Sequence, residues 1–521
     1  MIPRRSLQIV VLALIILVAV GEIYQYRLFY HDDAFISLRY VRNFLNGDGL
    51  VWNAGERVEG YSNFLLVIIV AALGRLGIDL ALAARIVGIL SYLLLAAFVF
   101  RRSYCAHQRS GNDWLWLIPV IITTTALPLV IWSLGGLETT LFALLITIGA
   151  MLFADGLDNN NRPLVSAGLA LGLASLCRPD GLLFVLVAFV TGLGAGLIAH
   201  RRFDRRLSGF LFGALALVVP HLIWRYTYYH GWLPNTYYVK AANPGGLLPY
   251  GLTYFKEYVL AFPFLPFLLV AGVIWGLINR AITTKLAWYG MTIVAYWGYV
   301  VAVGGDHMPA FRLLAPLVPL IGWLIFELVS LSPLMQRKSV DAVAVVFVFL
   351  LCAGQLLFPA EKIRRAQVMD GAALLGAEVG RYINANWPEG SVVALNTAGS
   401  TPYFAPKLRF IDMLGLNDST IARRPNPPIR TEMQKWPGHG KGDGRYVLSR
   451  RPDYIIIGPS NGDYANDFPW FLSDYELEGS AEFERLYQPV RVVIPMTTSG
   501  YEWYTESSLG ALRFIYYERR K

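Results

Sequence analysis

Long apolar runs dominate the first 360 residues of this 521-residue chain. A helix needs about 20 consecutive apolar residues to cross a bilayer, and runs near that length predict about eleven spans. The predicted spans are residues 8–26, 83–100, 114–132, 138–155, 163–177, 181–199, 207–224, 262–279, 286–303, 312–331 and 340–358. The pattern therefore predicts a polytopic α-helical membrane protein.

Two apolar runs are interpreted differently. Phe64–Leu76 is short and contains Arg75, so we expect a half-buried juxtamembrane helix rather than a span. Ile9–Val20 follows two arginines, as the apolar region of a signal peptide does, but no small-residue cleavage site follows it. We expect it to form an uncleaved first helix.

Basic residues predict the orientation of the spans. With Arg4 and Arg5 on the inside, the basic clusters at 101–102, 162, 201–206, 280–285 and 337–338 all fall on that same side. Counting residues 64–76 as a span would break this pattern. We therefore expect a multi-pass protein of the bacterial cytoplasmic (inner) membrane, in which the other loops and the C-terminal residues are extracytoplasmic.

The composition changes after residue 360, where apolar runs shorten and Pro, Gly and charged residues increase. A helical stretch at 372–386 precedes strand-like segments at 391–396, 454–458, 491–495 and 512–517. These segments predict a soluble, extracytoplasmic α/β domain over residues 361–521. Residues 1–360 would form the transmembrane domain.

Composition supports the membrane assignment and excludes several classes of site. Hydrophobic residues make up 55% of the chain and charged residues only 16%. The net charge of +9 resides in short loops, as membrane orientation requires, so no nucleic-acid partner is predicted. The 3 cysteines are scattered, which indicates neither a disulfide framework nor a zinc site. No GxGxxG or P-loop motif is present, so a nucleotide-bound substrate is not expected.

The unusual polar clusters lie in five loops that this orientation places outside. The loops are residues 27–62, 133–140, 177–181, 232–240 and 304–312. Polar residues from five loops on one side of the membrane predict an active site at its outer surface.

The first of these loops contains the sequence His31-Asp32-Asp33. Asp33 could simply cap a helix over residues 34–45 that ends at Gly47, but this explains only one of the two aspartates. Adjacent carboxylates repel each other, which raises the pKa of one or requires a cation. Glycosyl transfer needs a carboxylate near the anomeric carbon, so we expect at least one of the pair to be catalytic.

Two further acidic residues lie at span ends. Glu138 is a third catalytic candidate because ionisable groups at membrane depth are costly and usually functional. Its alternative role is to stabilise the first turn of a helix through the helix dipole. Asp180 lies between Pro179 and Gly181, which favours a structural turn.

Basic residues are rare in the predicted outside loops near the membrane. Arg178, Arg225, Lys240, His307 and Arg312 are candidates to bind a lipid phosphate, which needs cations at headgroup depth. The alternative for both Arg225 and Arg312 is a side chain that extends to the interface from a span end. The glycines before His307 could likewise form a simple turn.

Several motifs together resemble a known family. They are the block 32–63, GLETT (136–140), RPDG (178–181), PNTYYVK (234–240), GGDHMPAFRLLAPLVPL (304–320) and the tail segment GHGKGDGRYVLSRRPDYIII (438–457). They resemble the GT-C superfamily of polyprenyl-phosphate-dependent glycosyltransferases. More narrowly, they resemble the terminal β-(1→2)-arabinofuranosyltransferases of actinobacterial cell-wall arabinan and their bacterial relatives.

The resemblance implies a polyprenyl-phosphoryl-arabinofuranose donor, with Asp32 or Asp33 as the central carboxylate. Tyr61, Asn235 and Asp306 lie in the matching motifs and are expected to bind donor sugar or phosphate, with Arg178, Lys240, His307 and Arg312. The acceptor would be a glycan or a protein. The surrounding membrane lipid would be a further partner. The acidic pair leaves a divalent cation open as a cofactor, although no metal-ligand set is predicted.

Two other classes of function remain as alternatives. A transporter or flippase for a lipid-linked sugar should have inverted repeats and charged or broken helices at mid-membrane. A glycan-binding protein with a membrane anchor would not need so many spans or an acidic pair. The polar residues gather on one side instead, so we expect an enzyme.

Overall fold

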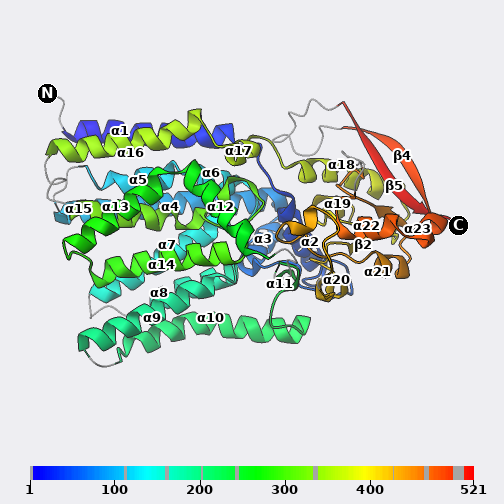
Figure 1. Ribbon diagram of the computed structural model, residues 1–521, viewed down its shortest axis with the longest axis horizontal. Coiled ribbons are helices and arrows are strands. Elements are labelled where there is room, and N and C mark those ends of the chain that lie inside the picture. Colours follow the sequence, from blue (N-terminus) through cyan, green and yellow to red (C-terminus); the bar gives the residue numbers. More distant parts are fainter. Residues whose placement is uncertain are drawn as a thin grey trace.

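The computed structural model describes residues 4–110, 114–158, 164–200, 203–240, 246–331, 338–425, 427–462, 469–496 and 510–521. Figure 1 shows two parts arranged along the longest axis. A bundle of long helices contains the N-terminus at its far end, and a smaller part with a β-sheet contains the C-terminus.

Helices form at each position where a span is predicted. They are α1 (Arg4–Gln25), α4 (Leu80–Ser110), α5 (Leu117–Thr124), α6 (Leu127–Leu134), α7 (Thr139–Asp158), α8 (Val165–Cys177), α9 (Gly181–His200), α10 (Arg206–Tyr229), α13 (Phe264–Ile278), α14 (Thr284–Ala302), α15 (Val318–Ser330) and α16 (Lys338–Leu357). Helix α12 (Leu248–Ala261) lies just before the predicted span 262–279 and was not predicted. The predicted span 114–132 is broken into α5 and α6. Pro128 explains the break, because it has no backbone N–H and its ring collides with the carbonyl one turn earlier.

Length and composition identify a smaller set of membrane-crossing helices. Among the described residues, 5 helices qualify, namely α1, α4, α7, α9 and α10. The number rises to 7 if the bent pairs α5–α6 and α12–α13 each count as one span. The remaining helices at predicted positions are shorter or less apolar. The polytopic architecture is therefore confirmed, whereas eleven spans stays a prediction.

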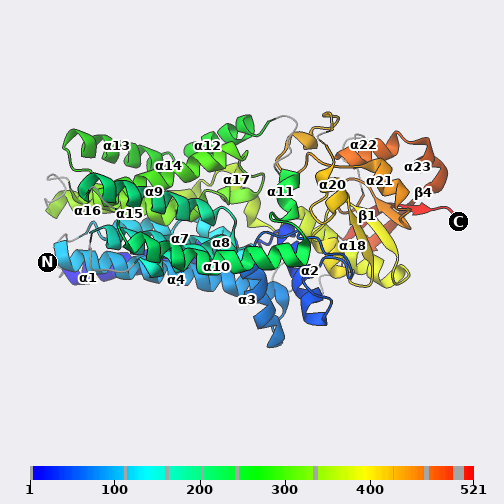
Figure 2. The same cartoon turned by 90° about the horizontal axis from the view of Figure 1, so that it is seen from below.

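Helix α3 (Phe64–Arg75) is the predicted juxtamembrane helix. It has 12 residues, or about 18 Å at 1.5 Å per residue, too short for a hydrocarbon core of about 30 Å. Only part of its surface is buried, and it packs against α2 (Asp32–Asn46) and α4. Figure 2 shows α2 and α3 at the junction between the bundle and the C-terminal part.

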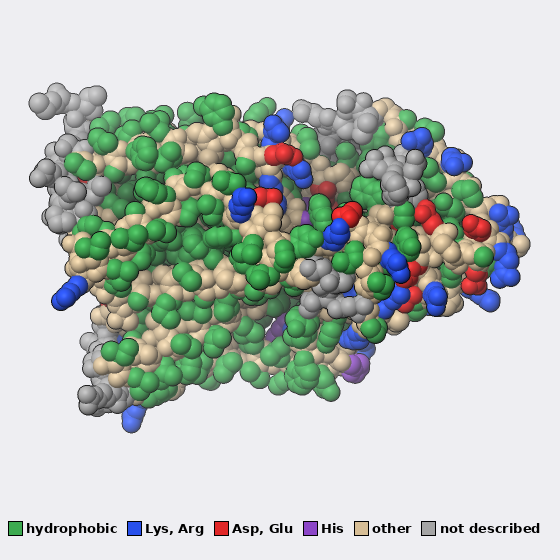
Figure 3. Space-filling view, in the orientation of Figure 1, with side chains coloured by type: hydrophobic (Ala, Val, Ile, Leu, Met, Phe, Trp, Pro, Cys, Tyr) green, Lys and Arg blue, Asp and Glu red, His purple; other side chains and the backbone are tan. Residues whose placement is uncertain are grey.

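The surface changes character along the molecule. Hydrophobic side chains cover most of the bundle on the face seen in Figure 3, as expected for a surface in contact with lipid. Charged side chains gather at the junction and over the C-terminal part. The apolar and charged regions thus match the two parts of the chain.

The C-terminal part is built around a mixed five-stranded sheet in the order β2-β1-β3-β5-β4. Its strands are β1 (Val392–Leu395), β2 (Arg409–Asp412), β3 (Tyr454–Ile456), β4 (Tyr487–Pro495) and β5 (Ala511–Arg519). Strands β2, β1 and β3 are parallel, and β5 pairs antiparallel with β3 and β4. The sequence did not predict β2, because only Phe410 and Ile411 in this strand carry an apolar signal.

The remaining helices are mostly short and lie in the C-terminal part, at its junction with the bundle or, for η2, against bundle helices α6, α7 and α15. They are α11 (Asn235–Lys240), η1 (Pro309–Phe311), η2 (Ala315–Leu317), α17 (Glu361–Arg364), η4 (Arg365–Gln367), α18 (Gly371–Asn386), α19 (Ser400–Phe404), α20 (Ser419–Arg423), η5 (Met433–Lys435), α21 (Gly444–Ser449), α22 (Leu472–Glu478) and α23 (Ala481–Leu486). Helix α18 matches the predicted helical stretch at 372–386.

Helix α2 and the segment after it join the two parts. Buried Arg39 donates hydrogen bonds to the carbonyls of Trp52, at 2.7 Å, and Leu408, at 3.2 Å. Asn53 exchanges two hydrogen bonds with the backbone of Phe410 in β2, at 2.8 and 3.2 Å. A buried guanidinium left unpaired would be costly, so these bonds hold the sheet against the first predicted outside loop.

Candidate active site

A cavity of about 940 Å³ lies between the end of the bundle and the C-terminal sheet. All five loops predicted to lie outside contribute to its lining. Their lining residues include Asp33, Glu138, Arg178, Lys240 and Arg312. The predicted convergence of these loops on one polar site is therefore confirmed.

The two adjacent aspartates have different roles in the structure. His31, not Asp33, is the N-cap of α2, because its Nδ1 accepts a hydrogen bond from the Asp33 backbone N–H at 3.2 Å. The capping alternative for Asp33 is therefore wrong. Asp32 binds the C-terminal part, with Oδ1 accepting from the Ser400 N–H at 2.8 Å and its own N–H donating to Asp370 at 3.0 Å.

These contacts make Asp32 a structural link. Its side chain is buried, and this loss of solvent, followed by repulsion from Asp370, raises its pKa to about 6. The hydrogen bonds from Ser400 act in the opposite direction. Asp32 thus joins α2 to the start of α19, and one of its carboxylate oxygens is bound by the protein backbone.

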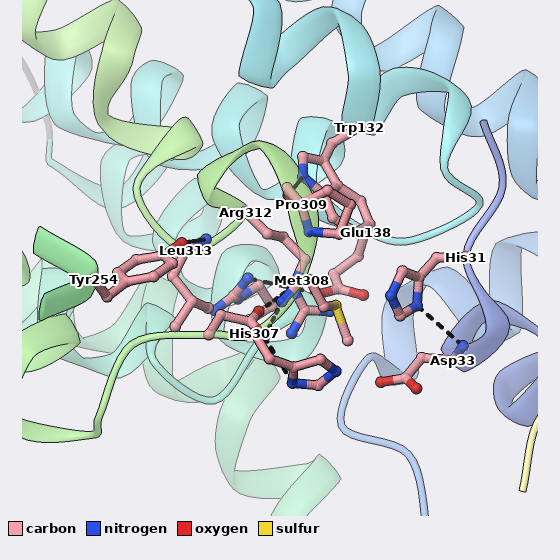
Figure 4. A network of polar contacts seen from close by, with 12 residues as sticks. His31, Asp33, Trp132, Glu138, Tyr254, His307, Met308, Pro309, Arg312 and Leu313 are labelled. Atoms are coloured by element: carbon pink, nitrogen blue, oxygen red, sulfur yellow. Dashed lines mark hydrogen bonds and ion pairs between the residues drawn. The ribbon is translucent and has the colours of Figure 1, made fainter. Parts of the chain in front are cut away.

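Asp33 is the aspartate left available for chemistry. Among the described residues, its carboxylate makes no hydrogen bond or ion pair. Loss of solvent raises its pKa, but the charges of His31, Lys240, His307 and Arg312 more than compensate, so the pKa lies below its usual value. Figure 4 shows Asp33, His31, Glu138 and His307 around one space. An ionised carboxylate without a partner can accept a proton from a substrate.

Glu138 is held by the first predicted outside loop. Asn63 donates a hydrogen bond to its Oε2 at 3.0 Å, and Ser37 in α2 orients Asn63 by donating to its Oδ1 at 3.0 Å. Both carboxylate and amide are buried. Glu138 lines the cavity but is already bound to Asn63, which fits positioning better than proton transfer.

Arg178 is fixed by hydrogen bonds on one side and makes only a longer ion pair on the other. Asp180 accepts two hydrogen bonds from it, at 3.0 and 2.8 Å, and Tyr296 donates to the same carboxylate at 2.8 Å. The remaining nitrogen, Nη1, is buried without a hydrogen-bond partner among the described residues, 3.7 Å from Oε1 of Glu138. A buried donor of this kind can be satisfied by a phosphate oxygen.

Arg312 is positioned by the loop at 304–312. Its Nε donates to Oδ2 of Asp306 at 2.9 Å, and its guanidinium lies 5.6 Å from the centre of the Trp132 ring. Gly305 has a φ of +69°, and a Cβ there would lie 2.5 Å from Tyr254. Position 305 therefore requires a glycine, both because its φ is positive and because Tyr254 leaves no room for a Cβ. Asp306 contributes to the site by positioning Arg312, because its carboxylate already accepts a hydrogen bond from that guanidinium.

Lys240 closes the charged side of the cavity. It ends α11, and its side chain is exposed to the cavity without a hydrogen bond or ion pair to any described residue. Although it faces this space, the enclosing protein and the charge of Arg312 lower its pKa, and Asp33 partly offsets this. His307 also faces the cavity, and loss of solvent lowers its pKa.

Two other candidates, Tyr61 and Asn235, differ in their positions. Tyr61 lines the cavity, and its hydroxyl lies 3.2 Å from that of Tyr229. Asn235 does not line it. The Asn235 amide instead donates to the carbonyls of Gly415 and Leu416, at 2.8 and 3.0 Å, so it holds α11 against the C-terminal part.

Arg225, another sequence candidate, lies outside the cavity lining as well. It forms a buried ion pair with Glu59, with 2.8 Å between Nε and Oε2. Its guanidinium therefore neither lines the cavity nor extends to the membrane interface.

Sequence reasoning missed the residues that the C-terminal part supplies. Asp370, Trp436, His439, Trp470 and Phe471 all line the cavity. His439 lies in the motif GHGKGDG, which carried part of the family resemblance and could have indicated it. The aromatic residues had no such signal, because tryptophan and phenylalanine are ordinary in a soluble core.

The acidic pair left a divalent cation open as a cofactor. In the described parts of the chain, no group of three or more His, Cys, Asp or Glu side chains is arranged to hold a metal ion. A divalent cation as cofactor stays a prediction.

Three comparisons relate this chain to known proteins. A family model described as a domain of unknown function, DUF8728, matches residues 361–504, within the C-terminal part. A curated terminal β-(1→2)-arabinofuranosyltransferase of Corynebacterium glutamicum is 32% identical over 368 residues, covering 61% of this chain and 50% of that protein. The protein of the same name from Mycobacterium tuberculosis is 27% identical over 328 residues, covering 56% and 51%. The chain thus spans about half the length of these relatives.

The fold has a solved counterpart. ArnT from Cupriavidus metallidurans in the apo state matches with a TM-score of 0.55 at 14% identity, over 97% of both chains. The same protein bound to undecaprenyl phosphate matches with a TM-score of 0.53 at 14% identity, over 78% of this chain and 86% of ArnT. At this identity the likeness shows the fold. The chain is therefore a multi-pass membrane protein that shares the fold of ArnT, and the predicted resemblance to terminal β-(1→2)-arabinofuranosyltransferases is confirmed.

Proposed function

We propose that this protein is a membrane glycosyltransferase that moves arabinofuranose from a polyprenyl phosphate to an extracytoplasmic acceptor. The observation that carries the proposal is the unpartnered Asp33 carboxylate, which faces Lys240, Arg312 and His307 in one cavity. The sugar arabinofuranose is supported by the names of the two curated relatives. The lipid carrier is supported by the undecaprenyl phosphate of ArnT, which shares the fold.

The geometry suggests how the chain's own residues divide the reaction. An acceptor hydroxyl attacks the anomeric carbon, its proton passes to Asp33, and a glycosidic C–O bond forms. The bond between the anomeric carbon and the phosphate oxygen breaks, and its electron pair leaves with the polyprenyl phosphate. Lys240, Arg312 and the Nη1 of Arg178, which makes no hydrogen bond to a described residue, stabilise the negative charge on that phosphate.

The proposed reaction requires the cavity to be extracytoplasmic. We propose eleven spans, made by α1, α4, α5 with α6, α7, α8, α9, α10, α13, α14, α15 and α16, in a bacterial inner membrane. The polyprenyl carrier then presents its sugar on the side where the C-terminal domain lies. Reporter fusions at Arg101, His200 and Lys338 should be cytoplasmic, and a fusion at Lys521 external. A cytoplasmic Lys521 fusion would contradict this orientation.

A transporter or flippase remains less well supported. Transporters place their sites near the bilayer midplane, between repeats. Here the elements that supply the polar side chains, including α2 and α11, lie at the end of the bundle beside the C-terminal part (Figure 1).

The decisive experiment measures transfer by the purified protein. We expect label to move from polyprenyl-phosphoryl-arabinofuranose, and not from a nucleotide sugar, because no nucleotide-binding motif is present. Polyprenyl-phosphoryl-mannose and polyprenyl-phosphoryl-glucose should be poor donors, since a preorganised pocket for a five-membered ring holds a six-membered ring differently. Efficient transfer from a hexose lipid, with none from the arabinose lipid, would overturn the choice of sugar and leave the lipid-phosphate reaction in place.

A further inference from the structure

The cavity has a second wall that the donor chemistry does not use. We call it the neutral wall and define it as residues 396–398, 414, 416, 436–439, 459, 470 and 471. Residues 396–398 follow β1 directly, residue 414 lies just after β2, and residue 459 lies just after β3; these three strands are parallel. All three strands thus present their carboxyl ends to the cavity, which is the edge where open α/β sheets bind ligands.

The neutral wall is aromatic and uncharged. Its residues include no Lys, Arg, Asp or Glu within the part of the chain that the structure describes. Trp436 is 41% exposed, and Trp470 and Phe471, with 6.4 Å between their ring centres, line the same cavity. His439 stacks on Phe471 with 6.0 Å between ring centres. Loss of solvent lowers the pKa of His439 to about 3, so its ring is neutral at pH 7.

The neutral wall meets the charged side of the cavity at His307. The His307 ring centre lies 4.9 Å from that of His439 and 6.2 Å from that of Trp436. His307 is also among the charges that act on Asp33. A molecule lying on Trp436 would therefore be next to the groups proposed to carry out the transfer.

We propose that the neutral wall is the acceptor subsite and that it binds an uncharged glycan, with one sugar ring against Trp436. A sugar ring has an apolar C–H face and a polar rim, which suits an aromatic platform bordered by a few polar groups. The residues of the neutral wall offer no counter-charge to a phosphorylated or strongly charged acceptor, and the adjacent cation, Lys240 beside Gly438, is assigned to the donor phosphate. This inference rests on the proposed function and specifies its acceptor.

The test compares acceptor and donor kinetics of the full-length protein. The donor is labelled polyprenyl-phosphoryl-arabinofuranose and the acceptor probe is an octyl arabinofuranosyl disaccharide. Trp436→Ala should raise the KM for the disaccharide roughly tenfold, as expected for loss of one aromatic stacking contact. The KM for the donor should change much less than the KM for the disaccharide. Trp436→Phe should recover most of the loss, because it keeps an aromatic face.

Trp232→Ala is the matched control. Trp232 is 57% exposed, stacks on Tyr226 and does not line the cavity, so its loss should leave both KM values unchanged. An equal change in donor and acceptor KM for Trp436→Ala, or no change in either, would overturn the acceptor subsite while the transfer reaction stands. Transfer to a Ser- or Thr-containing peptide, with none to the disaccharide, would also overturn it. If the wild-type protein releases no sugar from the donor, the proposed function itself fails.

Discussion

The two walls of the cavity differ in how far their residues can be recognised from the sequence. The charged wall, formed by Asp33, Glu138, Arg178, Lys240 and Arg312 with His307, comes from loops between apolar helices. The neutral wall comes from the edge of a sheet in a part of the protein rich in polar residues. Ionisable groups beside a bilayer are costly and are retained mainly where they have a task, whereas an aromatic residue on a soluble domain carries no such cost. The charged wall is therefore visible in the sequence, and the neutral wall is not.

The largest expected effect lies within the acidic pair of the charged wall. Asp33→Asn should lower kcat by roughly 10²-fold or more, because the proposed proton acceptor is lost. Asp32→Asn is the matched control and should change kcat less than tenfold, since an amide oxygen can still accept from Ser400. Steady-state transfer assays on both variants, with membrane insertion checked, measure this. Equal losses would remove the distinction between the two aspartates.

A smaller effect is expected for the cations. Lys240→Ala and Arg312→Ala should each raise the KM for the lipid donor by about tenfold, because a charge-assisted hydrogen bond contributes about 1.5–3 kcal/mol. The acceptor KM should change little. Lys407→Ala is the control, because Lys407 is an exposed lysine that does not line the cavity. If both KM values rise together for the two cavity variants, the residues support the fold of the site and do not bind donor phosphate.

The pH profile should identify Lys240 more precisely. Only the protonated ammonium attracts phosphate, so donor kcat/KM should fall as the pH rises through the pKa of Lys240. Because the enclosing protein and Arg312 lower that pKa, the fall should begin below the usual pKa of a lysine. Lys240→Arg should move this alkaline limb to higher pH, since arginine stays protonated. If the alkaline fall of donor kcat/KM stays at the same pH in Lys240→Arg, the fall reports the titration of another group.

The smallest effect concerns stability. The pKa of Asp32 is about 6 in the folded protein, above its usual value of 3.8. The folded state therefore binds the proton more tightly, and its stability should decrease as the pH rises from about 4 to about 6. Asp32→Asn removes this titration, so its Tm should exceed that of the wild type by roughly a few degrees at pH 7 and approach it at pH 4. A variant Tm that stays lower at pH 7 would show that the ionised carboxylate stabilises the link to Ser400.

Much of the site could be predicted because its residues interrupt long apolar runs. The five loops named from charge patterning all reach the cavity, and four of the five candidate cations line it. The exception, Arg225, pairs with Glu59, a contact between residues 166 positions apart that no local pattern encodes. Asn235 was misassigned for the same reason, because its partners lie near residue 415.

The sequence by itself determined the membrane class, the helix positions and the side of the bundle that carries chemistry. These follow from the length of apolar runs and from the cost of charge beside a bilayer, which act locally along the chain. Only the tertiary structure decided which aspartate is available and what forms the opposite wall. Asp32 and Asp33 are identical in sequence terms, and they differ only because Ser400 and Asp370 approach one of them from more than 330 positions away. The neutral wall exists only because three parallel strands end at the cavity, and strand pairing depends on contacts between distant segments.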